Sequence, residues 1–237
     1  MKLHFDKTDL KWRDAHEILA GGITPRPIAW VSTLGPDGVA SVAPFSFCGP
    51  LIVQPMIVGF NVSSRRTGRD KRTLVNIRFT RDFVWNVVTE ALAEQMNICC
   101  KNYPSNVSKF KEAGVTPAKS DVVKSPMVAE SPINLECRLV QILEFGEAPE
   151  IYGEFAGGPR TSHLVLGEVL KAHIEKDVYD ASSKEIIAAK LRAIGRLGGY
   201  DLYSRAVDGF FELRRPEDYP EVLLRYDMLY LSYVSHT

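Results

Sequence analysis

The stretch TPRPIAWVSTLGPDGVASVAPFSF, residues 24–47, contains two runs in which apolar side chains alternate with other residues. The runs at 28–33 and 39–47 are separated by the sequence Gly-Pro-Asp-Gly at 35–38. Alternation with a period of two is typical of β-strands, and Gly, Pro and Asp are the residues that turns favour. The stretch therefore predicts a β-hairpin.

The end of the second predicted strand carries little side-chain bulk. Ala43 and Ser46 are small, and Pro44 has no backbone N–H to donate to a neighbouring strand. One interpretation is a bend at the corner of a barrel, and the other is a place where a flat ligand approaches the backbone. The residues alone leave both interpretations open.

The rest of the chain alternates between strand-like and helix-like segments without a regular order. Helices inserted irregularly among strands favour an antiparallel sheet or barrel over a parallel βαβ fold. Residues 146–162 are rich in Gly and Pro and are expected to form a connection, and residues 104–131 a short helix followed by a surface loop. Further strands are predicted at 55–62, 81–89, 133–145 and 163–174, and helices at 12–21, 73–80, 90–103 and 182–199.

Composition narrows the classes of partner. The 237 residues carry 29 basic and 29 acidic side chains, so no overall charge attracts nucleic acid or an anionic membrane. No apolar run approaches the ~18 residues of a membrane span, and the first residues lack the apolar core of a signal peptide. The four cysteines have no metal-binding or disulfide spacing. We therefore expect a cytoplasmic protein with no nucleic-acid or membrane partner.

The sequence lacks the common nucleotide-binding and hydrolase motifs. No GxGxxG, GxxxxGK[ST], HExxH or GxSxG pattern is present, and the five histidines are dispersed, so no metal site is predicted. The basic stretch SSRRTGRDKRT at 63–73 combines cations and hydroxyls just before a predicted helix. Such a combination suits a phosphate-sized anion, although a solvated basic loop explains it equally well.

Several segments, taken in order, resemble the flavin reductase-like family. These are IAWVST, VAPFSF, the stretch from Lys71 to Asn76, DFVWNVV, SHLVLGEV and GRLGGYDLY, which together extend from about residue 20 to about residue 216. The resemblance implies a mainly β, FMN-binding split barrel, antiparallel with Greek-key connections and inserted helices, that forms a homodimer. It also implies one domain over residues 1–216 and a C-terminal extension over 217–237.

The resemblance implies a set of site residues. FMN would lie along the hairpin, and NAD(P)H would be the co-substrate, with His163 near the reacting rings as a catalytic residue. Arg72 stands where the family has an aspartate between the two residues that match its phosphate contacts. The expected cofactor-binding residues are Ser32, Thr33, Ala43, Pro44, Phe45, Ser46, Phe47, Lys71, Thr73 and Asn76.

Three functions are consistent with this reading. The first is an NAD(P)H-dependent flavin reductase that supplies reduced FMN to a partner monooxygenase or redox protein. The second is a flavoredoxin-type electron carrier that keeps its FMN, and the third is a phosphate-binding split barrel without a redox role. Hydride transfer to a flavin needs no protein nucleophile, which agrees with the lack of a catalytic triad.

Overall fold

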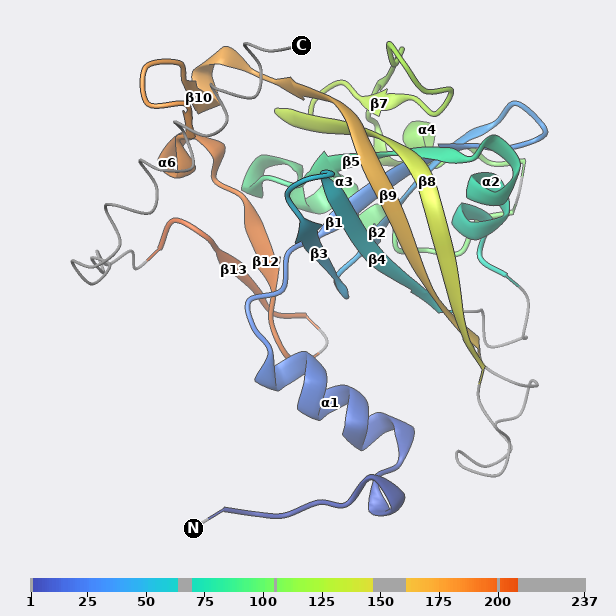
Figure 1. Cartoon of the computed structure of the whole chain (residues 1–237), viewed down its shortest axis with the longest axis vertical. Helices are drawn as coiled ribbons and strands as arrows, with labels where there is room; N and C mark the ends of the chain where they lie inside the picture. The colour runs from blue at the N-terminus through green and yellow to red at the C-terminus, as the bar shows by residue number, and fades with distance from the viewer. Residues whose placement is uncertain (1, 64–69, 105, 147–160, 200, 209–237) are drawn as a thin grey trace, which may run out of the picture. The chain divides into compact units, whose positions relative to one another are not determined.

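The main feature of the computed structural model is a seven-stranded antiparallel sheet (Figure 1). The structure describes residues 2–63, 70–104, 106–146, 161–199 and 201–208. The strands follow the order β2-β1-β5-β8-β9-β4-β3, and β8 and β9 are the longest of them. Their bounds are β1 Ala29–Leu34, β2 Ala40–Phe45, β3 Cys48–Ile52, β4 Ile57–Ser63, β5 Asp82–Val87, β8 Ile133–Gly146 and β9 Thr161–Ile174.

The sheet closes on itself where β2 passes into β3. These two strands lie at opposite ends of the strand order, yet only Ser46 and Phe47 separate them in sequence. The backbone N–H of Asn61 in β4 donates to the carbonyl of Phe47 at 2.8 Å. Because two residues cannot span a flat seven-stranded sheet, the sheet curls into a barrel. The mainly β split-barrel prediction is confirmed.

Strand β1 is buried on both sides. Ala29 and Val31 belong to the barrel interior, where Phe60 and Phe83 also pack. Trp30, on the other face, joins a second apolar cluster with Met96. The predicted hairpin is confirmed, with Trp30 opposite Pro44, and the missing N–H of Pro44 is tolerated because β2 has β1 as its single neighbour in the sheet.

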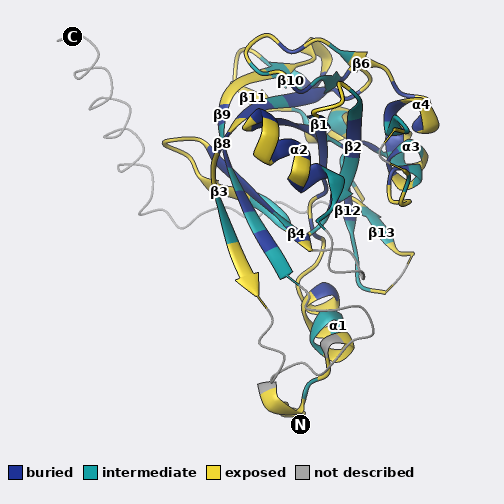
Figure 2. Cartoon of the chain, turned by 90° about the vertical axis from the view of Figure 1, so that its right-hand side faces the viewer, coloured by how far each residue is buried: buried dark blue, intermediate teal, exposed yellow. Residues whose placement is uncertain are grey.

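Short helices and strand pairs surround the sheet. The helices are α1 Trp12–Gly22, α2 Arg72–Thr80, α3 Ala93–Ile98, α4 Lys109–Ala113 and α6 Ala188–Leu191, with single 3-10 turns η1 Lys7–Asp9, η2 Glu90–Leu92 and η3 Lys176–Val178. Helix α2 turns one face toward the sheet and the other outward (Figure 2). The strand pairs are β6 Pro117–Ala118 with β7 Met127–Val128, β10 Tyr179–Asp180 with β11 Glu185–Ile186, and β12 Ile194–Arg196 with β13 Tyr203–Arg205.

The predicted helix over 182–199 is wrong. Only Ala188–Leu191 is helical, and Arg192, with a φ of 49°, ends it after one turn. The backbone beyond exchanges hydrogen bonds with Arg26, since the Arg196 N–H donates to Arg26 O at 2.8 Å and the reverse bond is 2.9 Å. Long-range pairing therefore overrides the helical propensity of this segment.

Other predictions changed in extent. The helix expected at 90–103 is shortened to η2 and α3, and the second hairpin strand ends at Phe45 rather than at Phe47. The strand predicted at 163–174 begins two residues earlier, at Thr161, so that His163 lies inside β9. Most of the connection expected at 146–162 falls outside the described residues.

The chain divides into two compact units, Met1–Val207 and Asp208–Thr237. The domain boundary predicted at 216/217 lies outside the described residues and stays a prediction. The described part of the first unit comprises residues 2–63, 70–104, 106–146, 161–199 and 201–207. Within its described part, no helix has the length and apolar character that crossing a bilayer requires.

Candidate functional site

Three cavities meet at Pro44 and Phe45, on the bare end of β2. We name them the basic cavity, of about 70 Å³, the open cavity, of about 490 Å³, and the side cavity, of about 260 Å³. The volume of the open cavity lies in the range that small-molecule sites occupy. A cluster of cavities of this kind is the first place to look for a ligand.

The basic cavity lies at the start of helix α2. Its lining includes Lys71, Arg72, Thr73 and Lys109, and among the described residues that line it none is acidic. The Lys71 ammonium lies 5.6 Å from the centre of the Phe45 ring, and Lys109 Nζ donates to Cys99 O at 2.6 Å. Cationic side chains beside the N-terminal end of a nine-residue helix favour an anion.

Arg72 is held by the turn of the first hairpin. Its Nη2 donates to both carboxylate oxygens of Asp37 at 3.0 Å and to Val39 O at 3.2 Å. Gly35 makes this possible, because a Cβ there would lie 2.4 Å from Asp37 Oδ1 and 3.0 Å from Arg72 Nη2. The residue that departs from the family pattern is thus fixed at the edge of the basic cavity.

The open cavity combines aromatic rings with a few polar groups. Phe45, Phe47 and Phe145 line it, together with serines of two paired strands, Ser63 in β4 and Ser162 in β9. Helix α1 supplies one wall through Ala15, His16 and Leu19, and the His16 ring lies 5.9 Å from the Phe47 ring. Such a mixture of flat apolar and polar groups suits an aromatic ring with a polar edge.

The side cavity adds a cation and a thiol on the opposite flank of Pro44. Its lining includes Met96, Cys100, Arg196 and Tyr203, and the Arg196 guanidinium lies 4.6 Å from the Tyr203 ring centre. The residue Cys100 is exposed as a whole, but desolvation of its thiol by neighbouring atoms raises the pKa, so this thiol stays protonated near neutral pH. The side cavity therefore offers contacts and no activated nucleophile.

Most of the predicted cofactor-binding residues meet at these cavities. Ala43, Pro44, Phe45, Ser46, Phe47, Lys71 and Thr73 all belong to their linings. The other three predicted residues, Ser32, Thr33 and Asn76, do not line these cavities. The structure therefore brings together the bare strand end and the residues that begin helix α2, and their role in binding a cofactor stays a prediction.

Ser32, Thr33 and Asn76 are fully buried and bonded to the protein itself. The Ser32 hydroxyl donates to Pro126 O at 2.5 Å, and Asn76 Nδ2 donates to Thr33 Oγ1 at 3.0 Å. These bonds tie β1 to helix α2 and to the segment before β7. In this structure, the three residues support the wall of the site from behind.

His163 also lies behind the cavity wall. Its side chain is 2% exposed, with Nδ1 3.3 Å from Val62 O and Nε2 3.4 Å from Glu144 Oε2. Its neighbour Ser162 lines the open cavity, and successive residues of a strand face opposite sides. The structure therefore does not bring the imidazole into the cavities, and a catalytic contact stays a prediction.

Sequence reasoning missed several lining residues. His16, Phe145 and Ser162 come from segments far apart in the chain, and Lys109 lies in the short helix expected within 104–131, to which no site role was assigned. Phe145 and Ser162 stand at the ends of predicted elements and His16 lies within one, and nothing but a polar or aromatic residue type marks these positions in the sequence. Such positions are too common to single out without the fold.

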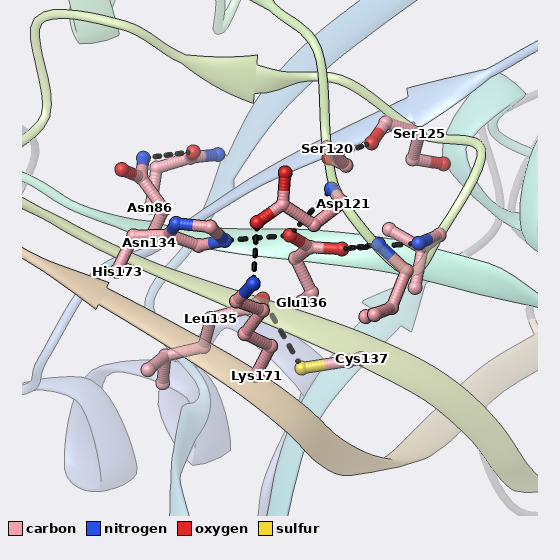
Figure 3. A network of polar contacts seen from close by, with 12 residues as sticks. Asn86, Ser120, Asp121, Ser125, Asn134, Leu135, Glu136, Cys137, Lys171 and His173 are labelled. Atoms are coloured by element: carbon pink, nitrogen blue, oxygen red, sulfur yellow. Dashed lines mark hydrogen bonds and ion pairs between the residues drawn. The ribbon is translucent and has the colours of Figure 1, made fainter.

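A separate polar cluster lies near the other end of the β8–β9 ribbon (Figure 3). Asp121, Glu136 and His173 place ligand atoms within 4.8 Å of one another. Glu136 is fully buried, and its carboxylate accepts the backbone N–H groups of residues 121, 122 and 123, while His173 Nε2 lies 2.6 Å from Oε1. Lys171 pairs with Asp121. Because these groups satisfy one another, we interpret the cluster as a structural anchor.

The chain resembles known proteins over most of its length. The model of the flavin reductase like domain matches residues 21–187. An uncharacterized protein of Aquifex aeolicus is 33% identical over 184 residues, which cover 78% of this chain and 86% of that protein.

Two solved structures share both fold and sequence similarity. Nitrilotriacetate monooxygenase component B from Bacillus cereus is 28% identical, with a TM-score of 0.79 over 90% of this chain and 99% of that one. The 2-nitrobenzoate 2-nitroreductase of Pseudomonas fluorescens is 25% identical, with a TM-score of 0.76 over 92% and 98%. With the fold and the family model in agreement, the chain belongs to the flavin reductase-like family.

Proposed function

We propose that this chain is a flavoprotein that binds FMN and transfers hydride to it from NAD(P)H. The proposal rests on one observation. A cationic cavity and an aromatic-lined cavity meet at the end of strand β2, at residues 43–47. FMN has the same two parts, a phosphate and a flat ring with a polar edge. Membership of the flavin reductase-like family supports the same ligand.

The residues present fit such a group. Lys71, Thr73 and Lys109 offer donors for a phosphate, and the lack of acidic side chains in the lining removes electrostatic opposition. Buried Arg72 Nη1 has no hydrogen-bond partner among the described residues, which is expected where a ligand supplies the acceptor. The small residues of β2 leave its backbone accessible beside the open cavity.

The protein would contribute binding and orientation rather than a reactive group. When bound, FMN accepts the hydride of NAD(P)H in its ring system. The cations of the basic cavity would hold the phosphate, and Phe45 and Phe47 would exclude water from one side of the ring. Ser46, Asn61 and Ser63 would offer polar groups to the second substrate in the open cavity.

We propose a positioning role for His163. Its Nδ1 contact with Val62 O fixes the register of β4 between Asn61 and Ser63, which both line the open cavity. In the same way, Ser32, Thr33 and Asn76 would act on the cofactor through the hairpin that they hold.

We further propose a homodimer that passes reduced FMN to a partner monooxygenase in the cytoplasm. The similarity to component B of nitrilotriacetate monooxygenase supports a partner of that kind, because a component B implies a separate partner. A second copy of the chain would cover the apolar side chains that the barrel leaves exposed.

Turnover of added FMN tests this function. A flavin reductase oxidises NADH or NADPH at a rate that rises and saturates with added FMN. Tightly held FMN with slow oxidation of both nucleotides would instead indicate a flavoredoxin-type carrier. No binding of FMN would leave a phosphate-binding barrel without a redox role and would contradict the proposal.

A further inference from the structure

Helix α1 has little apolar packing to hold it in place. It lies outside the barrel in both views (Figure 1, Figure 2), and Ala20 is the one buried residue among its described side chains. Ile18 and Leu19 are 46% and 48% exposed. Nevertheless, Ala15, His16 and Leu19 form a wall of the open cavity. Because helices in proteins depend mainly on tertiary packing, another interaction is expected to hold this wall.

The side chain of Arg26 supplies such an interaction. The residue is 7% exposed, and its Nη1 donates to the carbonyl of Ala20 in the last turn of the helix. Its Nη2 donates at 3.1 Å to the carbonyl of Leu197, in the turn between β12 and β13. One planar guanidinium therefore ties the end of α1 to a turn that lies 171 positions beyond Arg26.

The same guanidinium packs near an aromatic ring of the open cavity. Its central carbon lies 5.5 Å from the centre of the Phe47 ring, and the His16 ring lies 5.9 Å from that ring. A cation at this distance from an aromatic ring is attracted to it. Phe47 and His16 line the open cavity, whereas Arg26 is not among the described lining residues. Arg26 therefore acts on two parts of the cavity wall from behind.

Arg26 is a buried charge whose bonds go to the backbone. Desolvation lowers the pKa of its guanidinium, and the neighbouring charge of Arg196 lowers this pKa further. Both terminal nitrogens bond to carbonyls, and Nε is buried without a partner among the described residues. Burying a charge is costly, and here the cost is offset by two bonds that join different segments. An apolar side chain of the same size would leave both carbonyls without these donors.

The end of α1 meets the turn after β12 closely. A Cβ on Gly198 would lie 2.7 Å from the Cα of Gly21, which is shorter than a non-bonded contact between carbon atoms. A Cβ on Gly21 would meet nothing within 4 Å. The turn also carries the backbone partner of Arg26, because the Arg196 N–H donates to Arg26 O at 2.8 Å. The contact between α1 and this turn can therefore be disturbed from either side.

We propose that Arg26 is a positioning residue for the nicotinamide nucleotide, because it holds helix α1 and the Phe47 ring as one wall of the cavity where that substrate binds. This inference rests on the proposed function and assigns the α1 wall to one of its two ligands. The phosphate of FMN would bind at the basic cavity, which no described residue of α1 lines. Loss of the wall should therefore affect the two ligands differently.

Steady-state kinetics and FMN titrations test the proposal together. Arg26→Gln should raise the KM for NADH or NADPH roughly three- to thirtyfold, because the wall is then formed in only a fraction of the molecules. The kcat at saturating nucleotide should stay within about threefold, since the lost contact serves binding of this substrate. FMN affinity, measured by quenching of flavin fluorescence without turnover, should also stay within about threefold.

Hydrogen exchange of backbone amides measures the α1 wall directly. In Arg26→Gln, the amides of residues 16–22 should exchange roughly tenfold faster, while those of β4 and β9 keep the wild-type rates. Arg26→Lys retains the charge but not the fork of two terminal nitrogens, and should restore part of the nucleotide affinity and of the protection.

Gly198→Ala tests the same contact without removing the buried charge. Its added methyl group should displace the end of α1, raise the KM for the nucleotide and speed exchange in the helix. Gly21→Ala is its matched control, because the added methyl group meets no neighbour. Arg13→Gln is the control for Arg26→Gln, since Arg13 is an exposed residue of α1 outside the three cavity linings. Both controls should leave KM and exchange unchanged.

Each contrary result has a distinct meaning. An unchanged KM in both Arg26→Gln and Gly198→Ala would overturn the proposal, even if exchange in α1 becomes faster. Equal losses of affinity for FMN and for the nucleotide would mean that the wall does not serve the nucleotide in particular, which would also overturn it. A wild-type chain that neither binds FMN nor oxidises either nucleotide would refute the proposed function and this assignment with it. The exchange rates would then still show whether Arg26 holds α1.

Discussion

At the scale of single residues, the bare end of β2 has a physical explanation. Pro44 sits on an edge strand where its missing N–H costs no ladder bond, and Ala43 and Ser46 leave room beside it. Pro44 lines all three cavities, Ser46 lines the open and the side cavity, and Ala43 lines the basic cavity. Of the two interpretations that the sequence left open, the barrel corner is observed, and the ligand site stays a prediction that these cavities support.

Lys71 and Thr73 are expected to contribute directly to phosphate binding. Lys71→Ala and Thr73→Ala should each weaken FMN binding roughly ten- to a hundredfold, because each removes one bond to a charged group. Isothermal titration calorimetry measures the change. Lys111→Ala, in helix α4 and outside the cavity linings, is the control for loss of a surface charge. Unchanged affinity in both site variants would show that the phosphate binds elsewhere.

His163 should affect turnover more than cofactor affinity. The ring supports the β4 wall of the open cavity, away from the cationic residues that would hold the phosphate. His163→Gln should therefore lower kcat for NAD(P)H oxidation while FMN affinity stays within about threefold. Equal losses in affinity and kcat would instead indicate general loosening of the barrel.

At the scale of elements, buried side chains of the sheet anchor the segment 119–131. Asp82 in β5 accepts hydrogen bonds from the backbone of residues 124 and 125, and Asn86 Oδ1 accepts the Val128 N–H at 2.9 Å. Glu136 in β8 accepts three more (Figure 3). A segment expected to be a surface loop is thus fixed against the sheet, and Ser32 meets it through Pro126.

The Glu136 anchor predicts a dependence of stability on pH. Burial by itself raises the pKa of Glu136, but the backbone N–H groups of Asp121 and Val122 and the His173 ring hold it below the ordinary value of 4.5. A lowered folded-state pKa gives stability that is present above pH 4.5 and is lost as the pH falls through the lowered value.

Glu136→Gln should remove that dependence. Urea unfolding at pH 7 should show a loss of about 1.5–3 kcal/mol, since bonds to a buried carboxylate become bonds to an amide. Between pH 5 and pH 3, the variant should lose less stability than the wild type. Asp121→Asn, which breaks an exposed ion pair with Lys171, should change stability little. A wild type and a Glu136→Gln variant with the same pH profile would contradict the assignment.

Local patterns predicted the elements whose partners lie close in sequence. Alternation identified the hairpin and the long strands β8 and β9, and helix α2 begins within one residue of its expected start. The helix expected over 182–199 failed because residues 194–196 form strand β12, which pairs with β13. Arg196 also bridges to Arg26, about 170 positions earlier in the chain, and no local pattern carries that information.

The candidate site, like the fold, could be predicted from the sequence only in part. The cations beside helix α2 and the small residues of β2 were visible in the sequence, because their types alone are unusual at those positions. Ser32 and Thr33 were expected to face the ligand, but their hydroxyls are held by the segment around Pro126 and by Asn76. The Asp37–Arg72 pair joins a turn and a helix and could not be read from either.

At the scale of the whole molecule, apolar side chains remain exposed beyond the site. Leu51, Ile52, Val53 and Met56 at the β3–β4 hairpin are between 46% and 87% exposed, and α1 exposes Ile18 and Leu19. Among the described residues, strand β3 also lies at one end of the strand order of the sheet. Water-exposed apolar groups on a sheet edge favour association with a second chain.

We expect a homodimer with about twice the 26.5 kDa mass of the chain. Light scattering after size-exclusion chromatography measures this mass. Val53→Asp, in the most exposed part of the hairpin, should shift the protein toward monomer because it places a charge in the apolar contact. Val122→Asp, an exposed valine in the anchored segment, is the control. A monomeric wild type that holds FMN would refute the dimer.

The central claim is that a flavin binds at the bare end of β2 and accepts hydride there. The visible absorption spectrum of the purified protein with FMN, recorded before and after anaerobic addition of NADH or NADPH, tests it most directly. We expect the absorption bands of a protein-bound flavin, which bleach on addition of the nucleotide. A spectrum identical to that of free FMN, with no flavin retained on gel filtration and no change in the bands when either nucleotide is added, would contradict it.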